Sequence, residues 1–262
     1  MLPPGSLADR IWRTLGTWLS FSVFGLGACL ISVTVFPLLR LSARDPQVAR
    51  RRIQRAMQQA FRLFGWMMSR LGVVSYEVHG QERLRAPGRL IVANHPSLID
   101  VVLIISLMPA VDCIVKRALW KNPFLRWPVR WAGYIPNTTP ERLVEDCART
   151  LRAGNSLLVF PEGTRTEPGQ PMAFKRGAAQ IALAAGCEIL PITIVCSTPT
   201  LTKSERWWQV PRRRGHWVLT VGEAIRPAEF LADAAPALAA RRLTQHLHDY
   251  FSARVGALPV TV

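Results

Sequence analysis

The feature that most constrains this chain is an uncharged apolar stretch near its N-terminus. Residues 15–39 contain no Asp, Glu, Lys, Arg or His. A helix rises about 1.5 Å per residue, so this stretch can cross a hydrocarbon core of about 30 Å. It is too long for a signal peptide, and no small-residue cleavage site follows it. We therefore expect a membrane helix. It either spans the bilayer or, since Gly25, Gly27 and Pro37 permit a bend, embeds without crossing.

Basic residues on both sides of this stretch predict its orientation. Arg10 and Arg13 precede it, and a larger group follows it closely: Arg40, Arg44, Arg50, Arg51, Arg52 and Arg55. By the positive-inside rule, the rest of the chain is expected on the cytoplasmic face of the membrane, as for a bacterial inner-membrane protein.

Residues 46–71 are expected to form a second helix with a basic and an apolar side. Pro46 suits its first turn, and large apolar residues recur at helical spacing: Ile53, Met57, Phe61, Phe64, Met68 and Leu71. Such a helix lies on an anionic bilayer surface, or its apolar side packs on the rest of the protein. Both are compatible with the sequence.

The composition narrows the class of partner. Lys and Arg outnumber Asp and Glu by 33 to 17, which favours phospholipid headgroups, phosphorylated substrates or nucleic acid. Nine Trp against three Tyr are typical of an interfacial protein. The apolar stretch and the absence of a nucleic-acid-binding motif argue against nucleic acid. The five cysteines form no CxxC pair, so we expect buried, reduced thiols and no metal.

From residue 73 short apolar runs alternate with helical patterns. This predicts an α/β fold with a central, mostly parallel sheet flanked by helices. Two parts are expected: membrane and interfacial helices over 1–72, and a catalytic domain over 73–262. The expected strands are 74–78, 90–93, 112–115, 156–160, 189–195 and 217–221. The expected helices are 98–107, 123–131, 140–153, 175–185 and 236–251.

The most distinctive motif is Asn94-His95-Pro96-Ser97-Leu98-Ile99-Asp100. Pro96 keeps His95 out of the helical region, so the imidazole is expected at the end of a strand, before a helix capped by Ser97. Asp100 would lie in the first helical turn and could hold the His95 Nδ1 hydrogen, which leaves Nε2 as a general base. Alternatively, Ser97 and Asp100 form a capping box without catalysis.

A second polar cluster, Phe160-Pro161-Glu162-Gly163-Thr164-Arg165, also follows an apolar run. Gly163 permits a tight turn, and Arg165 offers a planar fork to a phosphate. Lys175 and Arg176 are expected to open the next helix, where free backbone N–H groups favour an anion. An ordinary charged turn at the surface is the alternative.

These motifs resemble those of the lysophospholipid acyltransferases, the superfamily that includes 1-acylglycerol-3-phosphate acyltransferase. The family pattern NHxSxxD is similar to residues 94–100, and FPEGTRS is similar to residues 160–166. Phe174-Lys175-Arg176-Gly177 matches a following F-K-x-G segment, and 190–194 looks like the family's proline-containing strand. The motifs occur in the family's order over residues 74–200.

The resemblance implies acyl transfer from acyl-CoA or acyl carrier protein to a lysophospholipid hydroxyl, with membrane lipids around it. His95 would be the general base and Asp100 its partner. The acceptor would be bound by Glu162, Gly163, Thr164 and Arg165, with Lys175 assisting. Neither an acyl-enzyme nor a metal or other cofactor is implied, and His246 and His248 are expected on a helix surface.

One position departs from the family pattern. The second motif carries an arginine after G-x-I, but here the chain reads Gly133-Tyr134-Ile135-Pro136-Asn137. In the family that arginine helps to bind the acceptor phosphate, so a different acceptor, such as a lyso-aminolipid or another lipid-linked hydroxyl, stays open. A non-catalytic basic membrane-binding protein is the alternative of another class. Residues 203–217, rich in Trp and Arg, either enter the interface, dock an acidic carrier protein or form a solvated loop.

Overall fold

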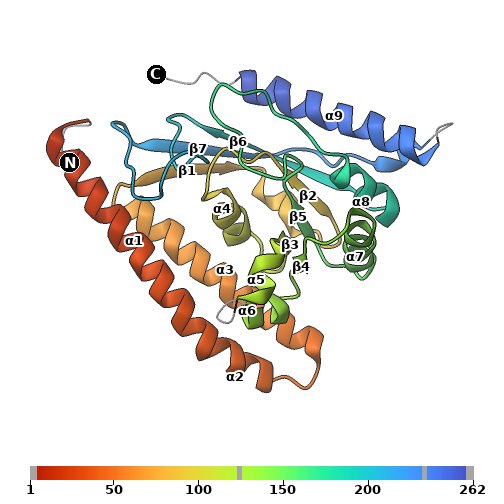
Figure 1. The fold of residues 1–262 in the computed structure, drawn as a ribbon, viewed down its shortest axis with the longest axis horizontal. Coiled ribbons are helices and arrows are strands. Elements are labelled where there is room, and N and C mark those ends of the chain that lie inside the picture. Colours follow the sequence, from red (N-terminus) through yellow and green to blue (C-terminus); the bar gives the residue numbers. More distant parts are fainter. Residues whose placement is uncertain (1–4, 123–125, 232–234, 258–262) are drawn as a thin grey trace.

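A computed structural model describes residues 5–122, 126–231 and 235–257. Within these residues seven strands form one sheet in the order β1-β7-β6-β2-β5-β3-β4. Figure 1 shows the sheet above the N-terminal helices and below the C-terminal helix α9 (Pro236–Ala257). The strand bounds are Val74–His79 (β1), Leu90–Ala93 (β2), Asp112–Val115 (β3), Ile135–Pro136 (β4), Leu157–Val159 (β5), Ile189–Cys196 (β6) and Gly215–Val221 (β7).

The sheet is parallel except at one place. β7 pairs antiparallel with β6 and parallel with β1. The central strands β6, β2, β5 and β3 are parallel neighbours, so their carboxyl ends lie at one edge of the sheet. In open parallel sheets this edge is where ligands bind. The predicted fold class, an α/β fold with a mostly parallel sheet, is confirmed.

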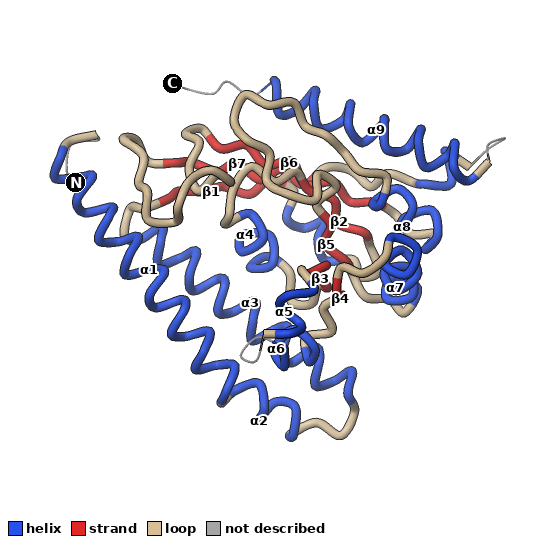
Figure 2. The backbone as a smooth tube through the Cα atoms, in the orientation of Figure 1, coloured by secondary structure: helices blue, strands red, loops and turns tan. Residues whose placement is uncertain are grey.

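Alternating side chains of the buried strands face two separate hydrophobic layers. In β2, Ile91 and Ala93 pack in the layer that contains α3 and α4, whereas Leu90 and Val92 pack in the layer of α7, α8 and α9. The helices on the two faces are seen on opposite sides of the red strands in Figure 2. Their bounds are Pro46–Arg70 (α3), Asp100–Leu107 (α4), Pro140–Arg152 (α7), Gly177–Ala185 (α8) and Pro236–Ala257 (α9).

The N-terminal stretch is helical, as expected, with a break at Thr34 between α1 (Leu7–Val33) and α2 (Val35–Leu41). Together they form the one helical stretch, among the described residues, that is long and apolar enough to cross a membrane by length and composition. One side stays exposed along its length, including Leu15, Leu26 and Leu38. The other side packs on α3, where the Phe24 and Phe64 rings lie 4.6 Å apart between centroids.

A buried polar cluster joins α3 to the sheet. Asp112, at the start of β3, is 1% exposed. Its carboxylate accepts hydrogen bonds from Gln54 Nε2 at 2.8 Å, from Thr150 Oγ1 at 2.6 Å and from Arg50. Gln54 also donates to the Ala132 carbonyl at 2.8 Å. The charge of Asp112 is therefore paired and fully hydrogen-bonded, as a buried charge requires.

Several predicted elements need correction. β4 was not expected, and α4 starts two residues later than predicted. The helix expected over 123–131 is α6 (Arg126–Trp131), a separate helix α5 (Arg117–Lys121) precedes it, and residues 123–125 lie outside the described part. All five cysteines are free, but only Cys113 and Cys147 are buried as expected; Cys187 and Cys196 are half-buried, and Cys29 is exposed on the apolar helix. The predicted boundary after residue 72 falls between α3 and β1 and stays a prediction.

Candidate active site

The strand-to-helix turn after β2 places His95 at the carboxyl edge of the sheet. The His95 Nδ1 atom lies 3.0 Å from Asp100 Oδ2, so the predicted contact between the two side chains is present. The imidazole is 16% exposed, whereas the carboxylate is fully buried. Asn94, the residue before His95, is hydrogen-bonded to β6. Its side-chain N–H donates to the Ile194 carbonyl, and its side-chain oxygen accepts from the Ile194 N–H, both at 2.7 Å.

Ser97 does not cap α4, which corrects the sequence-based expectation. The helix begins at Asp100, and the residue before it provides no side-chain cap. Instead, the Ser97 N–H donates to Asp100 Oδ2 at 2.6 Å, and the Ser97 hydroxyl donates to Oδ1. The buried Trp217 indole donates to the same hydroxyl at 3.1 Å. The capping-box geometry is therefore half present, but its carboxylate also holds the imidazole.

Burial raises the pKa of the Asp100 carboxyl, and the hydrogen bonds from His95 and Ser97 act in the opposite direction. Three donors around one buried carboxylate fix its orientation. Because Oδ2 faces Nδ1, the geometry suits the tautomer that carries hydrogen on Nδ1 and leaves Nε2 as the proton acceptor.

The two motifs meet through backbone and side-chain contacts. Glu162 Oε1 accepts from the His95 N–H at 2.7 Å, and Thr166 N–H donates to the His95 carbonyl at 3.0 Å. Thr166 Oγ1 donates to the other Glu162 oxygen. The Phe160 ring stacks on the imidazole, with centroids 4.2 Å apart. The structure thus places the Glu162–Arg165 turn beside His95.

Glu162 itself is only 5% exposed, so it holds the two turns together and offers little surface to a substrate. Burial raises the pKa of Glu162 to about 7, against the lowering effect of the hydrogen bond from the His95 N–H. Its assignment to substrate binding stays a prediction, and its observed contacts are structural.

Gly163 and Lys175 lie together at the surface of this turn. Gly163 has φ +71°, in the left-handed region, and a Cβ built there would lie 3.0 Å from Lys175 Nζ. Thr164 and Lys175 are exposed. The expected helix start at Lys175 is wrong: α8 begins at Gly177, and the Lys175 N–H donates to the Pro161 carbonyl at 2.8 Å. The ammonium group therefore lies over the turn, beside the glycine.

Arg165 is held by a loop that the sequence did not connect to it. Its guanidinium donates to the carbonyls of Leu201 and Thr202, at 3.0 and 2.6 Å. We call residues 198–214 the strap. Within the strap, the Leu201 backbone has φ +55°, a left-handed conformation that is rare for residues other than glycine. The Leu201 carbonyl also accepts a hydrogen bond from the Leu98 N–H at 2.9 Å.

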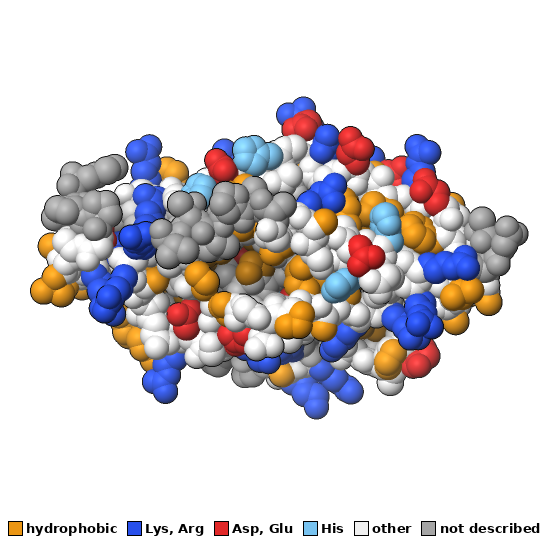
Figure 3. Space-filling model, turned by 90° about the horizontal axis from the view of Figure 1, so that it is seen from above, with side chains coloured by type: hydrophobic (Ala, Val, Ile, Leu, Met, Phe, Trp, Pro, Cys, Tyr) orange, Lys and Arg blue, Asp and Glu red, His pale blue; other side chains and the backbone are white. Residues whose placement is uncertain are grey.

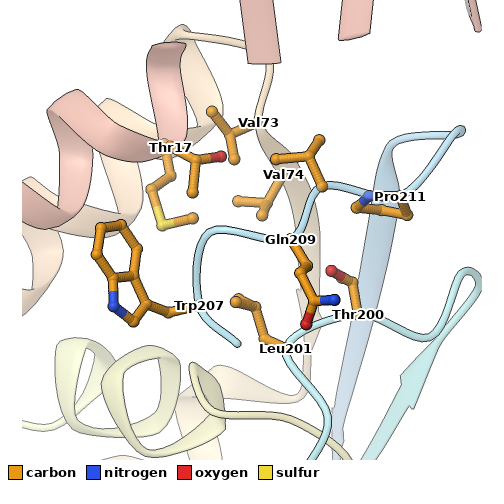
Figure 4. A pocket seen from close by; sticks show the side chains of 10 residues that line it. Thr17, Val73, Val74, Thr200, Leu201, Trp207, Gln209 and Pro211 are labelled. Atoms are coloured by element: carbon orange, nitrogen blue, oxygen red, sulfur yellow. The ribbon is translucent and has the colours of Figure 1, made fainter. Parts of the chain in front are cut away.

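The other end of the strap packs on the apolar helix α1. Trp207 lies 4.7 Å from the Trp18 ring and 5.0 Å from the Phe21 ring between centroids. Arg13, 1% exposed, donates to the carbonyls of Pro211 and Arg212 at 2.8 and 2.7 Å. A small cavity of about 20 Å³ lies at this contact. Figure 4 shows Trp207 and Leu201 lining it together with Thr17 of α1.

The sequence left open whether the tryptophans of residues 203–217 enter an interface, and it placed His246 and His248 on a helix surface. The structure shows where these side chains lie. Trp217 lies in β7 and is fully buried, so it belongs to the core and not to an interface. Trp208 is 38% exposed, and its ring carries the Arg206 guanidinium. On α9, His248 Nε2 lies 3.2 Å from the Met172 carbonyl, and the His246 ring contacts Phe230, 5.2 Å away between centroids.

A larger cavity of about 240 Å³ lies behind the His95 turn. Its lining includes Asn94, Ser97 and Glu162, residues 166–170, Met172, and Val255 of α9. Figure 3 views this side of the molecule and shows hydrophobic side chains at the floor of a hollow near its middle.

Lys116 is a candidate that sequence reasoning missed. Strand register places Val115 beside Pro136, so Lys116 and Asn137 follow at the same carboxyl edge. β3 also neighbours β5, whose end carries the Glu162–Arg165 turn. Lys116 is exposed. The sequence does contain a signal for Lys116: it is a basic residue directly after residue 115, the last residue of a predicted strand.

Comparison with known proteins supports the interpretation of these motifs. Residues 75–195 match the family model described as Acyltransferase. A 1-acyl-sn-glycerol-3-phosphate acyltransferase of Chlamydomonas reinhardtii is 31% identical over 178 residues, which cover 64% of this chain and 53% of that protein. The enzyme of that name from Pseudomonas aeruginosa is 28% identical over 180 residues, which cover 66% of each chain.

The fold also has a solved counterpart. The crystal structure of the 1-acyl-sn-glycerophosphate (LPA) acyltransferase PlsC of Thermotoga maritima superimposes with a TM-score of 0.68 at 23% identity, covering 95% of this chain and 97% of that one. The matched stretch covers about half of the Chlamydomonas relative and 31% of a chloroplastic Arabidopsis thaliana relative.

The domain described as Acyltransferase thus covers residues 75–195, a little under half of the chain. The similarity to 1-acyl-sn-glycerol-3-phosphate acyltransferases that the two motifs predicted is found in these relatives.

Proposed function

We propose that this protein transfers an acyl chain from a thioester, acyl-CoA or acyl carrier protein, to the free hydroxyl of 1-acylglycerol-3-phosphate during membrane lipid synthesis. The observation that carries the proposal is the 3.0 Å contact between His95 Nδ1 and the buried Asp100 carboxylate at the carboxyl edge of the sheet. The names of the relatives from Chlamydomonas reinhardtii and Pseudomonas aeruginosa support the acceptor.

In the proposed reaction His95 Nε2 removes the proton of the acceptor hydroxyl as its oxygen attacks the thioester carbonyl. Asp100 holds Nδ1 and stabilises the imidazolium that forms. The tetrahedral intermediate then collapses to the ester, and the departing thiolate takes the proton back from His95. Acyl transfer between two bound substrates needs no acyl-enzyme and no resident metal or other cofactor.

Cations around the turn would bind the acceptor phosphate. Gly163, Thr164 and Lys175 are at the surface of the turn, and Arg165 keeps a fixed position because the strap holds it. Asn137 stands where the family has an arginine, and the exposed Lys116 lies beside it at the sheet edge. Lys116 would supply the missing positive charge. If it does not, the acceptor is the alternative lyso-aminolipid or another lipid-linked hydroxyl.

We further propose that α1 and α2 attach the protein to the membrane, with the catalytic domain on the cytoplasmic face. The length and hydropathy of the helix support attachment. Because α1 packs along α3 and onto the strap, an embedded helix that stays beside the domain fits these contacts better than one that projects across the bilayer.

The test is a turnover assay with purified full-length protein in lipid vesicles. We expect 1-acylglycerol-3-phosphate to be acylated far faster than a monoacylglycerol or a lyso-aminolipid, with acyl-CoA and acyl carrier protein compared as donors. His95→Ala should lower turnover by about 10²- to 10⁴-fold while vesicle binding persists. Equal turnover by wild type and His95→Ala would contradict the proposal and would favour a non-catalytic membrane-binding protein.

A further inference from the structure

One stretch of the surface carries many cations and no acid. Between Asp112 and Glu141 the sequence contains no Asp or Glu. Four basic residues on α5 and α6 are exposed: Arg117, Lys121, Arg126 and Arg130. None of these four has an ion pair with an acidic side chain among the described residues. We call these four residues the α5–α6 patch.

Aromatic rings underlie the charges of this patch. The Arg130 guanidinium lies 5.0 Å from the Trp120 ring centroid and 5.8 Å from that of Trp127, and Arg126 lies 5.0 Å from Trp127. Trp127 itself is 43% exposed. A tryptophan flanked by arginines is the combination enriched where a membrane meets water, since the ring enters the interface and the cations meet the headgroups.

The position of the patch points to the same surface. α6 lies beside α2 and α3, as seen at the lower end of the molecule in Figure 1. There α2 exposes Leu38 and Leu41, at 66% and 83%. The patch is therefore continuous with the apolar side of the proposed membrane helices. Arg51, Arg52 and Arg55 on α3 add exposed positive charge at this end.

We propose that the α5–α6 patch is a binding surface for anionic lipid headgroups, which holds the protein on negatively charged membranes. This rests on the proposed membrane attachment and adds its lipid preference. An acidic carrier protein would also match the charge. The exposed tryptophan and the adjoining exposed leucines favour the lipid surface, because a carrier protein needs no apolar bilayer beside it.

The test measures vesicle binding of the full chain by flotation. One set of vesicles contains phosphatidylcholine alone, and a second set also contains phosphatidylglycerol. The test variant carries Arg117→Gln, Lys121→Gln, Arg126→Gln and Arg130→Gln. A matched control removes four exposed arginines on other elements: Arg85→Gln, Arg142→Gln, Arg241→Gln and Arg242→Gln.

We expect the test variant to bind vesicles with phosphatidylglycerol at least about tenfold more weakly than wild type, since each cation near an anionic membrane surface strengthens the binding. Binding to phosphatidylcholine should be unchanged, because α1 and α2 supply it. The control variant should keep the anionic preference. Turnover of a water-soluble short-chain acceptor should also be unchanged, which separates this proposal from the proposed reaction.

Three outcomes would overturn the proposal. The first is an equal loss in the control variant, which would mean that total charge decides. The second is an anionic preference unchanged in the test variant while its KM for acyl carrier protein rises, which would assign the patch to the carrier. The third requires no variant. If wild type binds both kinds of vesicle equally at low salt, the protein has no preference for anionic lipid and the patch is not a headgroup-binding surface. Unfolding temperatures of both variants show whether the fold is kept.

Discussion

The two turns that form the candidate site are held by different parts of the molecule. The His95 turn is tied to the sheet: Asn94 bonds to β6, and Ser97 bonds to Trp217 of β7. The Arg165 turn is tied at its base by Glu162, but its guanidinium is held by the strap, which rests on α1. His95, the predicted base, is therefore positioned by the core, and Arg165, the predicted anion-binding arginine, is positioned by contacts that begin at α1.

The largest expected effect concerns the core-held turn. Asp100→Asn should lower kcat about 10²- to 10⁴-fold with little change in KM, because the amide no longer fixes the Nδ1 hydrogen or stabilises the imidazolium. Steady-state kinetics measure this, with Asp146→Asn on α7 as the control. If Asp100→Asn kept the wild-type kcat, the carboxylate would only hold the start of α4. The turn held by the core would then have no demonstrated catalytic role.

The contact between the two turns should be visible in the pH dependence of stability. Glu162 has its pKa raised by burial from 4.5 to about 7 in the folded protein. The folded state then binds the proton more tightly, so the free energy of unfolding falls as pH rises from about 4.5 to about 7, by at most about 3 kcal/mol. Above that range the contribution is constant.

Glu162→Gln should remove this slope, since an amide does not titrate. Denaturant unfolding at a series of pH values measures it, and the exposed Glu141→Gln serves as the control. An identical slope in wild type and Glu162→Gln would show that another group titrates, and that Glu162 does not couple the turns through its charge.

The strap-held turn predicts a different kinetic signature. Trp207→Ala removes the ring contacts with Trp18 and Phe21, so Arg165 should lose its fixed position. We expect the KM for a phosphorylated acceptor to rise about tenfold with kcat nearly unchanged. The exposed Trp66→Ala on α3 is the control, and Trp207→Phe should restore much of the affinity. A fall in kcat alone would place the strap with the catalytic turn instead.

The smallest effect is expected at the far side of the core-held turn. Trp217→Phe removes the indole N–H that bonds to Ser97, a hydrogen bond of the order of 1 kcal/mol. The expected result is a severalfold lower kcat without a change in acceptor KM. A change in KM alone would show that β7 positions the acceptor and not His95. The two turns would then not differ in which kinetic constant they control.

Much of this arrangement could be predicted from local sequence. β2 and β3 have the predicted bounds because each is a short apolar run that ends at turn-forming or charged residues. The contact of His95 with Asp100 followed from Pro96 and a five-residue spacing. β4 was missed because Ile135 and Pro136 are too few to show a period, and only pairing with β3 makes them a strand.

The roles of single side chains were harder to predict. Ser97 has the composition of a helix cap, yet the buried Asp100 and Trp217 determine where its hydroxyl points. The residues around Arg165 predict a phosphate-binding side chain. They do not indicate that its guanidinium donates to the carbonyls of Leu201 and Thr202. Contacts between residues far apart in the chain are set by tertiary packing, which local patterns do not contain.

The Asp112 cluster has a consequence for making a soluble form of this protein. Removing the first 72 residues would delete Arg50 and Gln54 together with the rest of α3, so Asp112 would lose both its cation and a helix that covers it. The apolar layer on this face of the sheet would lose Ile53, Phe64 and Met68 as well. A shorter form that begins before α3 keeps these contacts and is therefore the better choice for crystallisation or screening in detergent-free buffer.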